Sequence, residues 1–151
     1  MKFKNKVCII TGGAAGIGRC LAESFSAEGA RVYVIDKEQV TIKNDLIHFF
    51  QGDIAEQTVI DTFIDWILAH EQQIDILINN ACLMKGGILS GCTYDDFLYV
   101  QRVGEPEDIV QAAFFLCDER NSFINGTNLT VDGGMSKLMV YHNDKGWTLD
   151  K

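Results

Sequence analysis

Residues 7–18 read VCIITGGAAGIG, a short apolar run followed directly by a glycine-rich turn. An uninterrupted apolar run of this length predicts a strand that is buried on both faces of a sheet. After the turn, apolar residues follow at helical spacing, at Ile17, Leu21 and Phe25, and Gly29 ends the predicted helix. A strand, a glycine turn and a helix in this order predict the first half of a βαβ unit.

The alternation of strands and helices continues along the rest of the chain. The β-rich segment 31–36 predicts a second strand, which completes a right-handed unit with parallel strands. The polar residues 37–45 predict a loop or a short irregular helix. The other expected elements are strands at 47–50, 74–78 and 128–131, and helices at 55–71, 93–100 and 106–117. This pattern predicts an α/β fold of the Rossmann-like, doubly wound type with a mostly parallel sheet.

Composition and charge exclude several classes of protein. The chain has 151 residues, of which 47% are apolar and 23% charged, and this fits one globular domain over residues 1–151. A net charge of −8 argues against binding to a nucleic-acid backbone. No apolar stretch suits a membrane helix or a signal peptide. The five cysteines are odd in number and unclustered, so we expect reduced cysteines, no metal site and a cytoplasmic protein.

The glycines of the turn suit a loop that binds a phosphate group. Gly12 allows a tight turn, and Gly16 lets backbone N–H groups approach a pyrophosphate at the positive end of the helix. Gly18 allows the helix to pack closely on the strand. The alternative is a glycine-rich turn that binds no ligand.

Asp36 ends the second predicted strand, eighteen residues after Gly18. A carboxylate at this position accepts hydrogen bonds from both ribose hydroxyls of an adenosine and repels a 2′-phosphate. The sequence therefore favours NAD over NADP, although the neighbouring Lys37 offers a cation that weakens this preference. The alternative role for Asp36 is that of a solvated turn residue.

Three short motifs together resemble the short-chain dehydrogenase/reductase family. They are the loop T-G-x-x-x-G-I-G at 11–18, Asp53 after the third strand, and Asn79-Asn80-Ala81 after the fourth. The resemblance implies that Asp53 contacts the adenine and that the Asn-Asn-Ala segment lines the cofactor ribose. The full set of expected cofactor-binding residues is Gly12, Ala15, Gly16, Ile17, Gly18, Asp36, Asp53, Ile54, Asn79, Asn80 and Ala81.

The carboxyl-terminal part of the chain carries the resemblance further. Residues 102–109 resemble the family's segment before its penultimate helix, and residues 124–134 resemble its final strand and loop. The expected parts are a nucleotide-binding part at 1–100, a last helix and strand at 101–136, and a tail at 137–151. The resemblance implies hydride transfer between a nicotinamide cofactor and a small alcohol or ketone substrate.

The family's catalytic residues have no counterpart between Val100 and Arg102. Family members use a Ser on the fifth strand and a Tyr followed by a Lys four residues later, and these fall in a segment that this chain lacks. Tyr141 and Lys145 have this spacing, but their polar surroundings disfavour a helix. We therefore expect a shortened, incomplete form of the fold and assign no catalytic residue.

The shortened form leaves questions of structure and function open. The fourth strand would keep an unpaired edge. Either the last strand pairs with this edge, or a homo-oligomer covers it. A third option is that the sequence joins pieces of a longer protein. The alternatives to an oxidoreductase are a non-catalytic dinucleotide-binding or interaction module and an inactive deletion product.

Overall fold

A computed structural model describes residues 1–82 and 103–133 of the chain. In these residues, four parallel strands form one sheet in the order β3-β2-β1-β4. The strands are β1 (Val7–Thr11), β2 (Arg31–Asp36), β3 (Ile47–Gln51) and β4 (Ile76–Asn79). The parallel sheet confirms the predicted α/β class, with the apolar first strand between β2 and β4.

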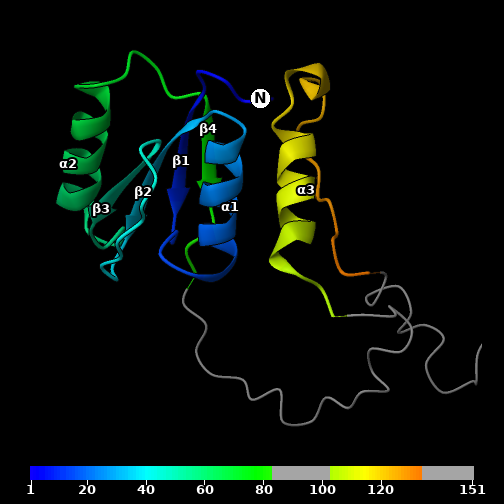
Figure 1. Cartoon of the computed structure of the whole chain (residues 1–151), viewed down its shortest axis with the longest axis horizontal. Helices are drawn as coiled ribbons and strands as arrows, with labels where there is room; N and C mark the ends of the chain where they lie inside the picture. The colour runs from blue at the N-terminus through cyan, green and yellow to red at the C-terminus, as the bar shows by residue number, and fades with distance from the viewer. Residues whose placement is uncertain (83–102, 134–151) are drawn as a thin grey trace, which may run out of the picture.

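Helices cover both faces of the sheet. They are α1 (Gly16–Ala27), α2 (Gln57–Leu68) and α3 (Pro106–Leu116), and a single 3₁₀ turn, η2 (Glu119–Asn121), follows. Figure 1 shows α2 on one face and α1 and α3 on the other. The described part of the chain is therefore a three-layer, doubly wound arrangement, as predicted.

Two apolar cores lie on either side of the sheet, and alternate residues of β1 and β2 supply both. On one face, Cys8, Ile10, Val32 and Val34 pack in a cluster with Leu21, Ala22 and Phe25 of α1. On the other face, Val7, Ile9, Tyr33 and Ile35 pack with Phe63 and Ile67 of α2. Burial on both faces explains why these strands are continuous apolar runs in the sequence.

Three aromatic rings join α3 to α1 and to the amino-terminal segment. The ring centroids of Phe3, Phe25 and Phe114 lie 4.7–5.0 Å apart. Val110 of α3 is buried in the same core. Because α3 is far from α1 in the sequence, this apolar contact fixes where the carboxyl-terminal segment lies.

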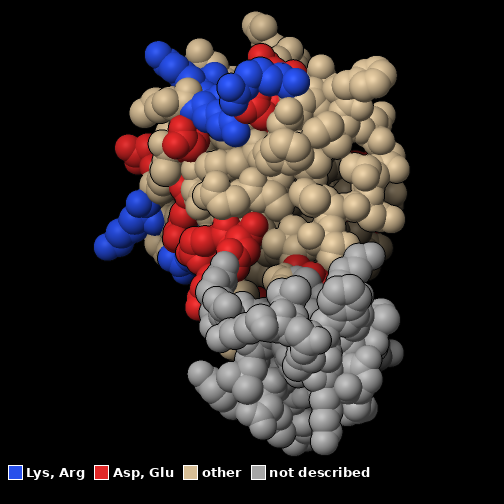
Figure 2. Space-filling model, turned by 90° about the vertical axis from the view of Figure 1, so that its right-hand side faces the viewer, with Lys and Arg blue, Asp and Glu red and all other residues tan. Residues whose placement is uncertain are grey.

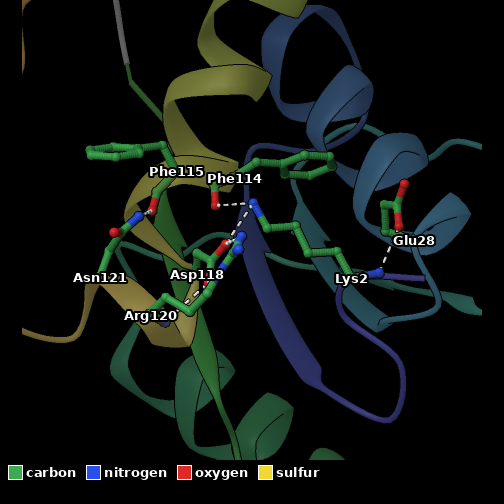
Figure 3. Close-up of polar contacts among 7 residues, drawn as sticks. All are labelled: Lys2, Glu28, Phe114, Phe115, Asp118, Arg120 and Asn121. Carbon is green, nitrogen blue, oxygen red and sulfur yellow. Dashed lines mark hydrogen bonds and ion pairs between the residues drawn. The ribbon is translucent and has the colours of Figure 1, made fainter.

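Lys2 adds polar contacts at the end of α3 (Figure 3). Its ammonium donates a hydrogen bond to the Phe114 carbonyl at 3.1 Å and lies 3.1 Å from an oxygen of Asp118. Its backbone N–H donates to the Glu28 carboxylate at 2.7 Å, just after α1. The Lys2 residue therefore links the carboxyl-terminal ends of α1 and α3.

The predicted strand at 128–131 is wrong, because the structure has no strand there. Leu129 and Val131 are 49% and 39% exposed, so the apolar side chains of this segment have little core to pack against. Strand formation depends on such packing more than on residue type. The predicted helix at 93–100 lies outside the described residues.

Other predicted boundaries were too wide by one to three residues, among them the start of α2 at Gln57 instead of 55 and the end of α3 at Leu116 instead of 117. The structure ends α2 at Leu68 and begins β4 at Ile76, whereas the sequence predicted 71 and 74. The Asp75 carboxylate accepts a hydrogen bond from the Val7 N–H at 2.8 Å, and its own N–H donates to the Val7 carbonyl at 2.9 Å. These bonds set the register in which β4 joins β1.

Within residues 1–82 and 103–133, no helix is long and apolar enough to cross a membrane. The same part of the chain holds no cluster of side chains suited to a metal ion. The described cysteines, Cys8, Cys20, Cys82 and Cys117, are free thiols.

Candidate functional site

The candidate site lies at the carboxyl edge of the sheet, the lower edge in Figure 1. From β1 the chain crosses to β2 and β3 on one side, and it then returns to β4 on the other side of β1. Ligands of open α/β sheets bind where the strand order reverses in this way. All the sequence-predicted site residues follow or end one of these four strands, or begin α1.

Close packing requires glycine at Gly12 and Gly13 of the β1–α1 loop and at Gly18 in the first turn of α1. A Cβ on Gly13 would lie 2.6 Å from a methyl group of Val34. Gly12 has a φ of +69°, and a Cβ there would lie 2.8 Å from the Ala81 Cα. A Cβ on Gly18 would overlap the Gly12 carbonyl oxygen. These glycines allow α1 and the end of β4 to approach the loop closely.

Gly16 is different, because its surroundings are open. It has a φ of +55°, and a Cβ there would meet no atom within 4 Å. The N-cap residue, Ala15, has no side-chain acceptor for the first N–H groups of α1, and the first turn has no acidic residue. These N–H groups, at the positive end of the helix dipole, fit an anionic group such as a pyrophosphate.

Asn80 and Thr11 hold the end of β4 against the glycine loop. The Asn80 side-chain amide donates to the carbonyls of Thr11 and Gly12 at 3.0 and 2.9 Å. The Thr11 hydroxyl accepts the backbone N–H groups of Asn80 and Ala81 at 3.1 and 3.0 Å. The sequence predicted no separate role for Thr11, although its place before the first glycine of the motif was the available signal.

Asp36 lies beside the glycine loop at the end of β2. One carboxylate oxygen accepts the Ala14 N–H at 2.9 Å, and the other accepts the Glu38 N–H at 3.0 Å. Each carboxylate oxygen has a second lone pair, so the group can still accept hydrogen bonds from ribose hydroxyls. Both bonds restrain the carboxylate at this position.

Asp53 forms an ion pair with Lys37, the residue that follows Asp36. The Lys37 ammonium lies 2.8 Å from an Asp53 oxygen, and Asp53 also accepts the Ala55 N–H at 2.9 Å. These contacts, that with Lys37 first, hold the pKa of Asp53 below its usual value. The same ion pair raises the pKa of Lys37.

The remaining predicted residues form the accessible surface of the site. Ala15, Gly16, Ile17, Ile54, Asn79 and Ala81 are all exposed. Thr11 at the end of β1 and Gly18 in the first turn of α1, which flank the loop, are buried instead. The edge therefore combines a positive helix end, a restrained carboxylate and an exposed surface.

Comparison with known proteins gives two matching family models. The model described as short chain dehydrogenase matches residues 6–103, and that described as Enoyl-(Acyl carrier protein) reductase matches residues 95–136. Together they cover both the carboxyl edge of the sheet and the segment that contains α3.

Similar sequences come from plants and animals. The chain is 32% identical to short-chain dehydrogenase reductase 5 of Arabidopsis thaliana over 97 residues, which are 58% of this chain and 38% of the relative. It is 27% identical to the L-fucose dehydrogenase of Mus musculus over 154 residues, 96% of this chain and 56% of the relative. The chain thus spans about two fifths to three fifths of these relatives' length.

Solved structures share the fold. A short chain dehydrogenase from Leptospira borgpetersenii with bound NAD+ superposes with a TM-score of 0.76 at 19% identity, covering 89% of this chain and 94% of that one. A 3-ketoacyl-(acyl-carrier-protein) reductase from Brucella melitensis complexed with NADH gives 0.75 at 18% identity, covering 89% and 99%. Because the short chain dehydrogenase model matches well over half of the chain, this protein belongs to the short-chain dehydrogenase family of oxidoreductases.

Proposed function

We propose that this chain binds NAD at the carboxyl edge of its sheet and serves hydride transfer between the nicotinamide and an alcohol or ketone. One observation carries the proposal. The open amino-terminal end of α1 and the Asp36 carboxylate at the end of β2 lie beside the same glycine loop, whose Ala14 N–H donates a hydrogen bond to Asp36 at 2.9 Å. A dinucleotide presents a pyrophosphate and an adenosine ribose to such a pair of groups.

Each part of the site has a role in this proposal. The N–H groups of residues 16–18 bind the pyrophosphate, and Asp36 accepts the ribose hydroxyls. Asp53 and Ile54 contact the adenine, while residues 79–81 line the second ribose. The bound nicotinamide itself supplies the hydride chemistry. The bound NAD+ and NADH in the two solved neighbours support this assignment.

The preference for NAD over NADP rests on Asp36. Its two carboxylate oxygens are fixed by the backbone N–H groups of Ala14 and Glu38, so the negative charge cannot turn away from a ligand at low cost. A 2′-phosphate placed near this carboxylate is repelled.

A non-catalytic dinucleotide-binding module is the second candidate. Reduction of a carbonyl needs a proton donor, and residues 80–102 contain no Tyr with a Lys four residues later. Tyr33 and Lys37 have this spacing, but they lie on and directly after β2, where Tyr33 is buried and its hydroxyl donates to Glu71. Tyr94 and Tyr99 have no Lys four residues later, and Tyr141 with Lys145 lies outside the described residues.

NADH fluorescence titration of the whole chain tests the proposal. We expect saturable binding that Asp36→Asn weakens roughly tenfold or more, because a charged acceptor is lost. Asp45→Asn, a matched change in an exposed loop residue, leaves the affinity unchanged. Absence of saturable binding overturns both candidates. Binding with turnover of secondary alcohols or ketones supports the oxidoreductase, and binding without turnover supports the module.

We also propose a cytoplasmic homo-oligomer. The free thiols of the described cysteines support a reducing compartment.

Leu77 of β4 and Phe115 of α3 are 59% and 47% exposed, and Figure 2 shows a broad uncharged area on the face that carries α3. Light scattering of the purified chain tests the oligomeric state. We expect the mass of two or more chains, and the mass of one chain at micromolar concentration contradicts self-association.

A further inference from the structure

The end of β2 is attached to the end of β3 through the backbone carbonyls of Asp36 and Lys37. The Gly52 N–H donates to the Asp36 carbonyl at 2.8 Å, and the Gln51 side-chain amide donates to the Lys37 carbonyl at 3.0 Å. The Lys37 side chain also contacts the segment that follows β3, because its ammonium lies 2.8 Å from an oxygen of Asp53. Backbone and side chain of Lys37 are thus both engaged with the segment that ends β3.

This pairing matters because Lys37 is the cation next to the ribose-binding carboxylate. A free ammonium at this place attracts a 2′-phosphate and offsets the repulsion by Asp36. The Lys37 and Asp53 side chains are 63% and 29% exposed. An ion pair that is this accessible is weak, so it biases the position of Lys37 without locking it.

We propose that Asp53 is a specificity-determining residue that works through Lys37. By holding the ammonium at the end of β3, it prevents Lys37 from compensating the charge of a 2′-phosphate, and it thereby maintains the preference for NAD. This inference rests on the proposed function, in which Asp36 receives the adenosine ribose. Without the Asp53 carboxylate, Lys37 is free to reach the added phosphate.

Isothermal titration calorimetry of the whole chain tests this role with ADP-ribose and 2′-phospho-ADP-ribose. These probes lack the nicotinamide, so they report on the adenosine side of the site alone. The quantity compared is the Kd for 2′-phospho-ADP-ribose divided by the Kd for ADP-ribose. Both probes carry the same adenine, so a change in how Asp53 meets that base weakens both equally and cancels in this ratio.

We expect Asp53→Asn to lower the ratio about three- to tenfold, the effect of one added charge contact at a partly exposed site. Lys37→Met leaves the ratio within about twofold of the wild type, because the paired ammonium contributes little to it. The double variant behaves like Lys37→Met, and Asp45→Asn is the matched control. Circular dichroism shows that each variant keeps its fold.

Three results overturn the inference. One is an unchanged ratio in Asp53→Asn while ADP-ribose still binds, and another is an equal fall in the double variant. The third is a several-fold rise of the ratio in Lys37→Met. This variant keeps Asp53, so its result does not depend on whether a change at Asp53 disturbs folding. If the wild type binds neither probe, the proposed function fails, and the inference fails with it.

Discussion

Gly16 and Gly18 lie in the same turn of α1, but the structure requires glycine there for different reasons. Gly18 leaves no space for a Cβ, because the Gly12 carbonyl occupies that position. Gly16 has open space and needs glycine only for its positive φ. Gly18 is therefore needed for packing of the fold, whereas the open space at Gly16 is available to the proposed ligand.

This difference predicts unequal effects on stability. Gly18→Ala lowers the free energy of unfolding by about 2–3 kcal/mol, because the added methyl forces α1 away from the loop. Gly16→Ala costs about 1 kcal/mol through its backbone conformation. Urea unfolding of both variants measures the two values. Equal losses would contradict the close packing at Gly18.

Thr11 gives a second prediction at the level of one side chain. Thr11→Val keeps the shape of the residue but leaves the Asn80 and Ala81 N–H groups without their acceptor. We expect a loss of about 1–3 kcal/mol in the free energy of unfolding, together with weaker NADH binding. Thr11→Ser keeps the hydroxyl and is the matched control. A Val variant as stable as the Ser variant would show that these bonds contribute nothing.

Motif order was enough to predict that the candidate site residues meet at one edge of the sheet, but not the contacts among them. The glycine loop, Asp36, Asp53 and residues 79–81 each end or follow a strand, and parallel strands bring their carboxyl ends to one edge. The hydrogen bonds between Thr11 and Asn80 and the ion pair of Lys37 with Asp53 join residues at the ends of different strands. Such contacts depend on side-chain reach in the folded sheet, which spacing along the sequence does not reveal.

Among the elements, α3 depends most on partners distant in sequence. Pro106 and the acidic residues after it predicted where the helix begins, and the structure adds a capping box between Glu105 and Asp108. Its position against α1 comes from Phe114 and Lys2.

We predict that Lys2→Met loosens the end of α3. The variant keeps most of the aliphatic stem but loses the bonds to the Phe114 carbonyl and Asp118. Amide hydrogen exchange in residues 113–118 becomes several-fold faster, as expected for a loss of about 1 kcal/mol. Lys4→Met, at an exposed neighbouring position, leaves this exchange unchanged. Equal exchange in both variants would contradict the role of Lys2.

The sequence predicted elements best where burial and periodicity agree. The predicted strand at 31–36 matches β2 in both bounds, because its residues alternate between two buried cores. The segment 128–131 also contains residues that favour strands, Leu129, Thr130 and Val131, but it pairs with no strand in the described part of the chain. A strand of this kind is set by its surroundings, and residue type alone predicts it poorly.

At the scale of the whole molecule, carboxylates paired in the folded state make stability depend on pH. Glu71 accepts hydrogen bonds from Arg31 at 2.5 and 2.7 Å and from the Tyr33 hydroxyl at 3.1 Å. The bonds to Arg31 are the main reason that the pKa of Glu71 is lowered. Burial, followed by the Glu71 bond, raises the pKa of Tyr33 to about 12.

The sign of this dependence follows from the lowered pKa. The unfolded chain binds the proton more readily, so the pair stabilises the fold above the ordinary Glu pKa of about 4.3. This contribution is lost as the pH falls from there through the lower folded-state pKa. We predict that Glu71→Gln costs about 1–2 kcal/mol at neutral pH and less in acid. Urea unfolding across this range measures both, and a loss that is constant with pH would contradict the prediction.

The central claim is that the carboxyl edge of the sheet binds NAD. Amide hydrogen exchange of the whole chain, with and without saturating NAD+, tests it most directly because it locates the ligand. We predict slower exchange at residues 12–18, with smaller effects near Asp36 and at residues 79–81, and no change in α2. Unchanged exchange at residues 12–18 under saturating NAD+, or protection confined to other parts of the chain, would contradict the claim.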